Sequence, residues 1–157
     1  MIERLSHLLN RAAEHSIFGL GIGMAMIVAA QVFFRYVLNH SLFWSEELAR
    51  YLMVWLTFLG AGVAYYRRVH PGIDVLTRRL FRKHQRRLEI LIHAVSLSFF
   101  SILIVYGIRF AWFVRLQFSP ALSIPKWIVF AVIPVSGAIL AVHSLHLLVS
   151  TAGRGRA

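Results

Sequence analysis

Apolar residues in this chain of 157 gather in four long blocks, separated by polar segments. The blocks cover roughly residues 16–38, 46–66, 88–112 and 126–150. Each is near the length of about 20 mostly apolar residues with which a helix crosses a bilayer. The pattern therefore predicts an all-α integral membrane protein with four transmembrane helices, forming one membrane domain over residues 1–157.

The segment between the second and third blocks has a helical pattern of its own. In "IDVLTRRLFRKHQRRLEIL" apolar residues recur at helical spacing and basic residues occupy the other side. This predicts an amphipathic interfacial helix over about residues 73–87, with its basic face toward anionic headgroups of the lipid bilayer. Asp74 is a candidate cap for its start, and His70 lies in the same inner-surface loop. A solvated basic loop is the alternative.

Composition supports membrane insertion and excludes several functions. Hydrophobic residues make up 59% of the chain, too many for one small soluble core, and the formal charge is +11. No nucleic-acid recognition motif accompanies that charge, so we expect no nucleic acid as a partner. The absence of cysteine excludes disulfides and thiolate metal sites.

The basic residues also predict an orientation. Twelve of the 17 lie in residues 1–15, 67–87 and 151–157, and the other five lie toward the opposite ends of the blocks or between them: Arg35, Arg50, Arg109, Arg115 and Lys126. The positive-inside rule then places both termini in the cytoplasm. The first block is long enough to span, so we expect a retained helix rather than a cleaved signal. Trp44, Trp112 and Trp127 fall at the predicted outer interface, where tryptophan is enriched.

Charged residues gather where the first hairpin meets the second block, in "WSEELAR" and just before it: Arg35, Glu46, Glu47 and Arg50. Ser45 is a candidate cap for the second helix, with both acids in its first turn. Arg50 is at helical pairing distance from both acids, and Arg35 can reach them across the hairpin. An interfacial ion-pair network follows. A proton relay would need acids deep in the spans, and Glu89 is too shallow.

Small residues recur in the first block, in "GLGIGMAMIVAA". Gly19 and Gly23 form a small-xxx-small pair, and Gly21 begins a second ridge. Small residues allow close approach of helices in a membrane, so this face is predicted to pack against another helix.

Around the charged cluster the chain resembles the small membrane subunit, of the DctQ type, of TRAP (tripartite ATP-independent periplasmic) transporters. The similarity covers roughly residues 17–148. It is carried by the following residues: Arg35, Tyr36, Trp44, Glu46, Glu47, Arg50, Tyr51, Gly60, Gly62, His70, Asp74, Pro125, Trp127, Pro134 and Gly137. Pro71 and Gly72 depart from the family's pattern after His70.

The resemblance implies a subunit of the bacterial inner membrane without catalysis or cofactor. It would scaffold a large elevator-type carrier subunit (M-type) that takes up a carboxylate-bearing solute with sodium. A periplasmic substrate-binding protein would deliver the solute. Arg35, Trp44, Glu46, Glu47 and Arg50 would then be structural or form a subunit or docking interface. Gly60 and Gly62 would join the other glycines in helix packing.

Three other functions are considered. A haem-binding cytochrome b-type anchor would use His93 with His143 or His146 on the third and fourth spans. A small homodimeric exporter would need an acid embedded in the membrane, and none is evident. An enzyme would need a nucleophile elbow, a metal-binding spacing or a phosphate loop, and the sequence has none.

Overall fold

The structure is a computed structural model that describes residues 2–67 and 82–153. Its elements are α1 (Ile2–Tyr36), α2 (Ser45–Tyr66), α4 (Arg82–Phe113), α5 (Lys126–Phe130) and α6 (Val132–Gly153). Four helices in the described residues are long and apolar enough to cross a membrane. The predicted all-helical fold with four spans is therefore confirmed.

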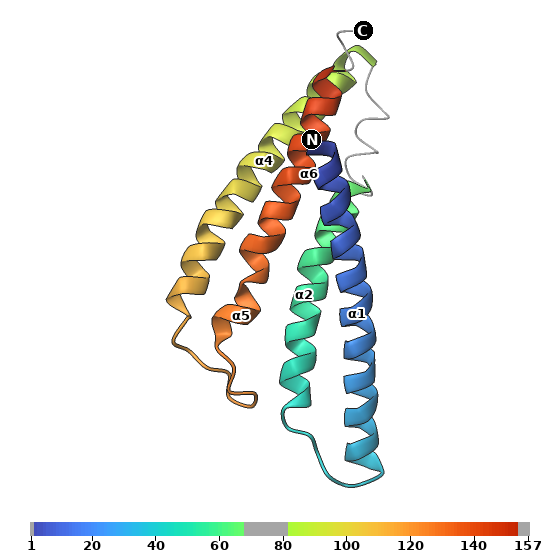
Figure 1. Ribbon diagram of the computed structural model, residues 1–157, viewed down its shortest axis with the longest axis vertical. Coiled ribbons are helices and arrows are strands. Elements are labelled where there is room, and N and C mark those ends of the chain that lie inside the picture. Colours follow the sequence, from blue (N-terminus) through green and yellow to red (C-terminus); the bar gives the residue numbers. More distant parts are fainter. Residues whose placement is uncertain (1, 68–81, 154–157) are drawn as a thin grey trace.

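The helices run alternately up and down (Figure 1). The start of α1, the end of α2, the start of α4 and the end of α6 lie toward one end, which we call the terminal end. The loops of residues 37–44 and 114–125 lie at the other, which we call the hairpin end. Connections between neighbouring antiparallel helices thus lie outside the spans, as expected where lipid offers no partner for irregular backbone.

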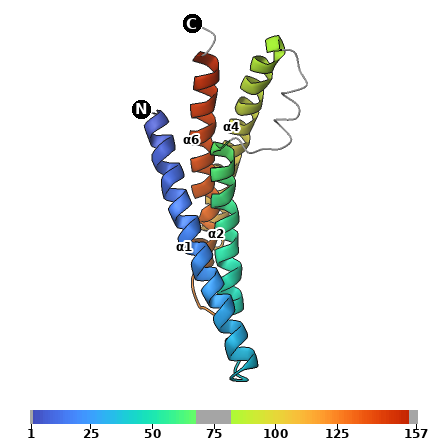
Figure 2. The ribbon, with the colours of Figure 1, turned by 90° about the vertical axis from the view of Figure 1, so that its right-hand side faces the viewer.

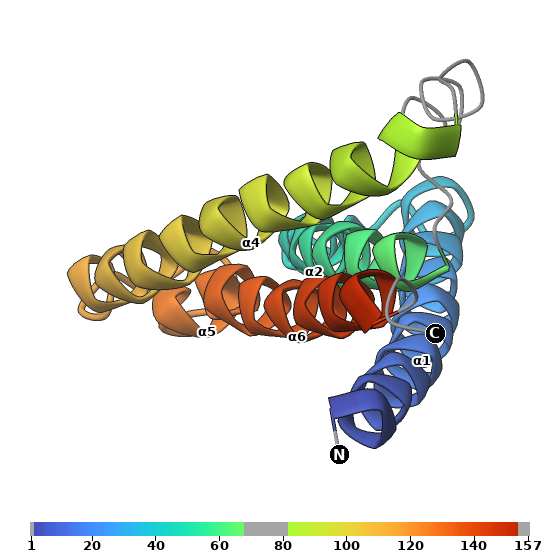
Figure 3. The same ribbon diagram turned by 90° about the horizontal axis from the view of Figure 1, so that it is seen from above.

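Helix α6 is the centre of the bundle and packs against α1, α2 and α4. Seen along the bundle, α4 and α1 lie on opposite sides of it (Figure 3). Val132, Ser136 and His143 of α6 are completely buried. A core of Tyr65, Phe100, Leu140 and Leu147 joins α2, α4 and α6.

Helix α1 begins at Ile2, well before the predicted start at residue 16. Its first turns are too polar to be recognised as part of an apolar block, but Ser6, Asn10 and Ala13 are buried in the structure. At 35 residues it is about 52 Å long, against a hydrocarbon core of about 30 Å. Figure 2 shows it crossing α2 at an angle, and tilt in the bilayer is one way in which a long helix fits a thinner hydrocarbon core.

The fourth span is locally irregular at Ala131, between α5 and α6. Pro134 has no N–H group, and its ring disfavours a regular helix around the carbonyl of residue 130. α5 accordingly ends at Phe130, and α6 begins at Val132. Ala131 N still donates to Trp127 O at 2.8 Å and Val135 N to Ala131 O at 3.2 Å, so Lys126–Thr151 counts as one candidate span, as predicted.

The outward faces of the spans are apolar, as lipid requires. Large hydrophobic side chains such as Phe18, Met26, Val95 and Phe99 are more than half exposed in the chain alone. Of the predicted interfacial helix, residues 82–87 continue directly into α4. The remainder, with His70 and Asp74, lies outside the described residues.

Candidate functional site

The charged cluster lies at the hairpin end, as predicted, and its first contact joins α1 to α2. Arg35 Nη2 donates to Glu46 Oε1 at 2.9 Å, and Gln31 Nε2 donates to the same oxygen at 3.1 Å. The two charged side chains are about half exposed, 47% and 55%. The predicted approach of Arg35 across the hairpin is thereby confirmed, and solvent and salt screen the pair.

The hairpin between α1 and α2 is shaped by its backbone. Asn39 adopts a positive φ of 51°, which asparagine tolerates, and His40 N donates to Phe34 O at 3.0 Å. The predicted cap by Ser45 is wrong. Trp44 occupies the cap position without a side-chain bond, while buried Ser45 donates its Oγ hydrogen to Leu42 O at 2.6 Å.

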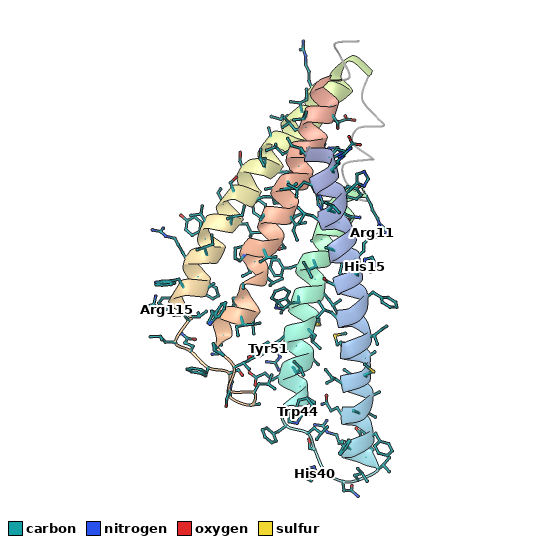
Figure 4. The ribbon with its side chains drawn as sticks, in the orientation of Figure 1. Arg11, His15, His40, Trp44, Tyr51 and Arg115 are labelled. Carbon is teal, nitrogen blue, oxygen red and sulfur yellow. The ribbon has the colours of Figure 1, made fainter. Side chains whose placement is uncertain are left out.

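Glu47 makes a different set of contacts from its neighbour. Its Oε2 accepts hydrogen bonds from Ala121 N at 2.8 Å and from Leu122 N at 3.2 Å. Its Oε1 accepts a hydrogen bond from the Tyr51 hydroxyl, one turn further along α2. Tyr51 lies on the side of α2 that faces the 114–125 loop (Figure 4). Glu47 therefore holds that loop against α2.

The 114–125 loop is itself closely hydrogen-bonded. Buried Ser119 donates its N–H to Ile124 O at 2.9 Å, and Lys126 N donates to Gln117 O at 2.8 Å. Ser123 turns the chain at a positive φ of 53°. Sequence reasoning missed these residues, although the Ser-Pro and Ile-Pro dipeptides of "SPALSIP" are turn signals.

In the described residues, the side chains of Arg50 and Trp44 make no hydrogen bond or ion pair of the kind that Glu46 and Glu47 make. Arg50 is exposed, and in the described part of the chain neither Glu46 nor Glu47 forms an ion pair with it. The expected pairing was wrong because both carboxylates are occupied by other donors. Trp44 is partly buried at the start of α2 (Figure 4).

A second polar network, at the terminal end, was not predicted. It draws on all four long helices. Ser6 Oγ lies 2.8 Å from Nδ1 of the buried His143, and the Tyr66 hydroxyl lies 2.7 Å from His7 Nδ1. The Tyr65 hydroxyl lies 2.9 Å from His93 Nδ1.

Further bonds in the same region tie the helices together. Ser144 Oγ donates to His93 O at 2.9 Å, and Arg67 Nη2 donates to Glu14 Oε1 at 2.8 Å. Such bonds fix helices against one another where no hydrophobic effect drives association.

The predicted packing glycines behave unequally. A Cβ added at Gly19, Gly21, Gly23 or Gly60 would meet nothing within 4 Å in this chain. At Gly62 it would lie 3.4 Å from Ile139 Cγ2. The tight approaches are elsewhere: a Cβ at Gly107 would lie 2.9 Å from Ile133 Cγ2, and one at Gly137 would lie 3.1 Å from Ile104 Cγ1.

Residues 24–154 match the family described as "Tripartite ATP-independent periplasmic transporters, DctQ component". The chain belongs to this family. TRAP transporter small permease subunits are thus its kin, and that role is not enzymatic.

Three relatives illustrate the match. A TRAP transporter small permease protein inferred for Haemophilus influenzae is 28% identical over 96% of this chain and 94% of its own length. The C4-dicarboxylate TRAP transporter small permease protein DctQ of Rhodobacter capsulatus is 28% identical over 88% of this chain and 62% of its own length. The isethionate TRAP transporter permease protein DctMQ of Oleidesulfovibrio alaskensis is 26% identical over 80% of this chain and only 21% of its own length.

Membership of this family does not support the alternative function of a haem-binding membrane anchor. His93 and His143 each engage a hydroxyl from another helix, and His146 lines a surface groove with Ile2 and Glu3. No group of three or more candidate metal ligands occurs among the described residues. Histidines bonded to neighbouring helices are the ordinary structural case.

Proposed function

We propose that this chain is the scaffolding small subunit of a TRAP transporter, bound to a large M-type carrier subunit. The carrier would move a carboxylate-bearing solute with sodium, after a periplasmic binding protein delivers it. The small subunit would extend and brace the static part of the carrier. Both termini would lie in the cytoplasm, and the hairpin end would face the periplasm.

The observation that carries this proposal is the set of side-chain hydrogen bonds that join separate elements at the hairpin end. Glu46 joins α1 to α2, and Glu47 joins α2 to the loop that precedes α5. The chain's long helices are thus connected at this end by side chains as well as by loops. A subunit fixed in this way suits a body that stays still while a partner moves.

The placement of the acidic residues in the described part of the chain agrees with a supporting role. The acids of the described residues lie near the ends of the spans: Glu3, Glu14, Glu46, Glu47 and Glu89. A carboxylate-bearing solute and its coupling ion would need polar groups deep in the bilayer. The longer DctMQ relative, in which a segment similar to this chain is about a fifth of a permease protein, supports a large partner subunit.

Reconstitution tests the proposal directly. The chain is purified from its native membrane in mild detergent, and the co-purifying large subunit is identified. Sodium-driven uptake is then measured in proteoliposomes holding this chain, the large subunit or both, with the binding protein outside. We expect sodium-driven uptake only in proteoliposomes that hold both subunits, so omission of this chain should abolish it. Uptake by this chain alone, or a Soret band in the purified complex, would contradict the proposal.

A further inference from the structure

We propose that the hairpin end holds a binding site for an anionic phospholipid, in a groove between α4 and residues 127–134. The groove has a volume of about 430 Å³. Its lining is Ile108, Ala111, Trp112, Arg115, Trp127, Ala131 and Pro134. Pockets that hold small ligands commonly have volumes of about 300–1,000 Å³.

The groove follows from how α4 and α6 pack. Their closest approach is at Gly107, where Ile133 and Pro134 lie against the α4 backbone. Beyond that point α4 carries Ile108, Ala111 and Trp112, and the fourth span carries Trp127, Ala131 and Pro134. The groove lies between these two sets of side chains, next to the tight contact at Gly107.

Arg115 supplies the charge that would recognise the headgroup. Its guanidinium carbon lies 3.8 Å from the centroid of the Trp112 ring, so the group stacks on the groove wall. No described carboxylate forms an ion pair with it. Figure 4 shows Arg115 at the hairpin end of α4, apart from Trp44 at the start of α2. A stacked guanidinium keeps its N–H edge available, and that edge matches a phosphate.

The surroundings favour an anion over any other ligand. Arg109 lines an adjoining depression, and Lys126 starts α5 beside the groove. Of the two acids at this end, Glu46 is bound to Arg35, and Glu47 is occupied by loop amides. The groove thus has positive charge without a competing carboxylate nearby.

The apolar lining favours a lipid over a free anion. All groove residues except Arg115 are apolar or aromatic, and inorganic phosphate would leave that lining unused. Trp112 and Trp127 are 69% and 45% exposed, and exposed tryptophan of this kind sits at headgroup depth. The adjoining depression lies across the ridge of Ile108 and Trp112, so a two-chain lipid can place one chain on each side.

Photo-cross-linking tests this site. The full chain is reconstituted in phosphatidylcholine vesicles with a minor fraction of diazirine-bearing phosphatidylglycerol or, separately, diazirine-bearing phosphatidylcholine. Mass spectrometry then measures adducts on residues 108–115 and 127–134. We expect a roughly fivefold preference for phosphatidylglycerol, the factor that corresponds to about 1 kcal/mol for one cation near an anionic headgroup. Adducts on the exposed face of α1 should show no such preference.

Two variants and a control separate headgroup from chain. Arg115→Gln should abolish the preference, whereas Arg50→Gln, an exposed arginine at the same end, should keep it. Ala111→Leu should lower adducts with both lipids by filling the groove. Equal adducts from both lipids, or an unchanged preference in Arg115→Gln, would overturn the site. Displacement by inorganic phosphate would indicate a free-anion site instead. Loss of the adducts in the complex with the large subunit would show that a partner helix fills the groove.

Discussion

Glu46 and Glu47 show how adjacent residues of one type come to have separate tasks. Neighbours on a helix point about 100° apart, so the two carboxylates face different elements. Glu46 reaches the arginine and glutamine of α1. Glu47 reaches the amides of Ala121 and Leu122, which are far away in the sequence. One short acidic pair therefore connects α2 to both of its neighbours at the hairpin end.

Alanine substitution of each acid should loosen a different loop. Glu47→Ala removes the acceptor for two backbone amides, so exchange of the Ala121 and Leu122 amides should quicken by roughly tenfold. Glu46→Ala should leave those amides protected, and it should affect residues near Arg35 instead. Hydrogen–deuterium exchange of the purified chain in detergent measures both. Equal exchange of the two amides in Glu47→Ala and in the unsubstituted chain would show that Glu47 does not hold the loop.

The same cluster shows what side-chain spacing can predict. The contact of Arg35 with Glu46 was predictable because a short hairpin brings the ends of two spans together. The role of Glu47 could not be predicted from the sequence, because its partners are backbone amides, which residue types do not reveal. Helical spacing made Arg50 a candidate partner for either acid, but spacing does not show which of several possible partners an acid will bind.

At the scale of the helices, the glycine pattern was informative about packing but not about its place. The first span has the densest small-residue motif, but a Cβ added at Gly19, Gly21 or Gly23 would meet nothing within 4 Å in the described residues. The close crossing of α4 and α6 uses isolated glycines, Gly107 and Gly137. A small residue permits close approach, but only the arrangement of helices decides whether a neighbour is present. The packing of the Gly19 and Gly23 face against another helix stays a prediction.

Substitution of Gly107 should destabilise the bundle. Its added Cβ would lie 2.9 Å from Pro134 Cδ and 3.0 Å from Pro134 N, and backbone cannot yield cheaply. Gly107→Ala should therefore cost about 1–3 kcal/mol of unfolding free energy.

Gly60→Ala is the matched control, because its Cβ meets nothing in this chain. Replacing a glycine inside a helix should be neutral or stabilising by about 0.5–1 kcal/mol. Unfolding in mixed micelles, followed by helical circular dichroism, measures both variants. If Gly107→Ala unfolds at the same denaturant fraction as Gly60→Ala, α4 and α6 are not in close contact at this point.

The whole molecule has two polar ends of different construction around apolar spans. The hairpin end is fixed by carboxylates acting on exposed or partly exposed donors. The terminal end is fixed by hydroxyl–imidazole hydrogen bonds, of which the one between Ser6 and His143 is buried, and by an ion pair from Arg67 to Glu14. The four spans were predictable from apolar length, since each helix meets lipid on at least one face. The terminal-end network was not, because it depends on which helices meet.

The hairpin end is predicted to face the periplasm and the terminal end the cytoplasm. Labelling of single cysteines tests this orientation, and the chain suits that test because it has no cysteine of its own. Single cysteines are introduced at exposed positions: Ser41→Cys and Gln117→Cys at the hairpin end, and Glu3→Cys at the terminal end. The excess of basic residues near the terminal end should keep that end in the cytoplasm. A membrane-impermeant maleimide should therefore label the first two in intact cells with permeable outer membranes. It should label Glu3→Cys only after the inner membrane is opened, and the reverse pattern would place the hairpin end in the cytoplasm.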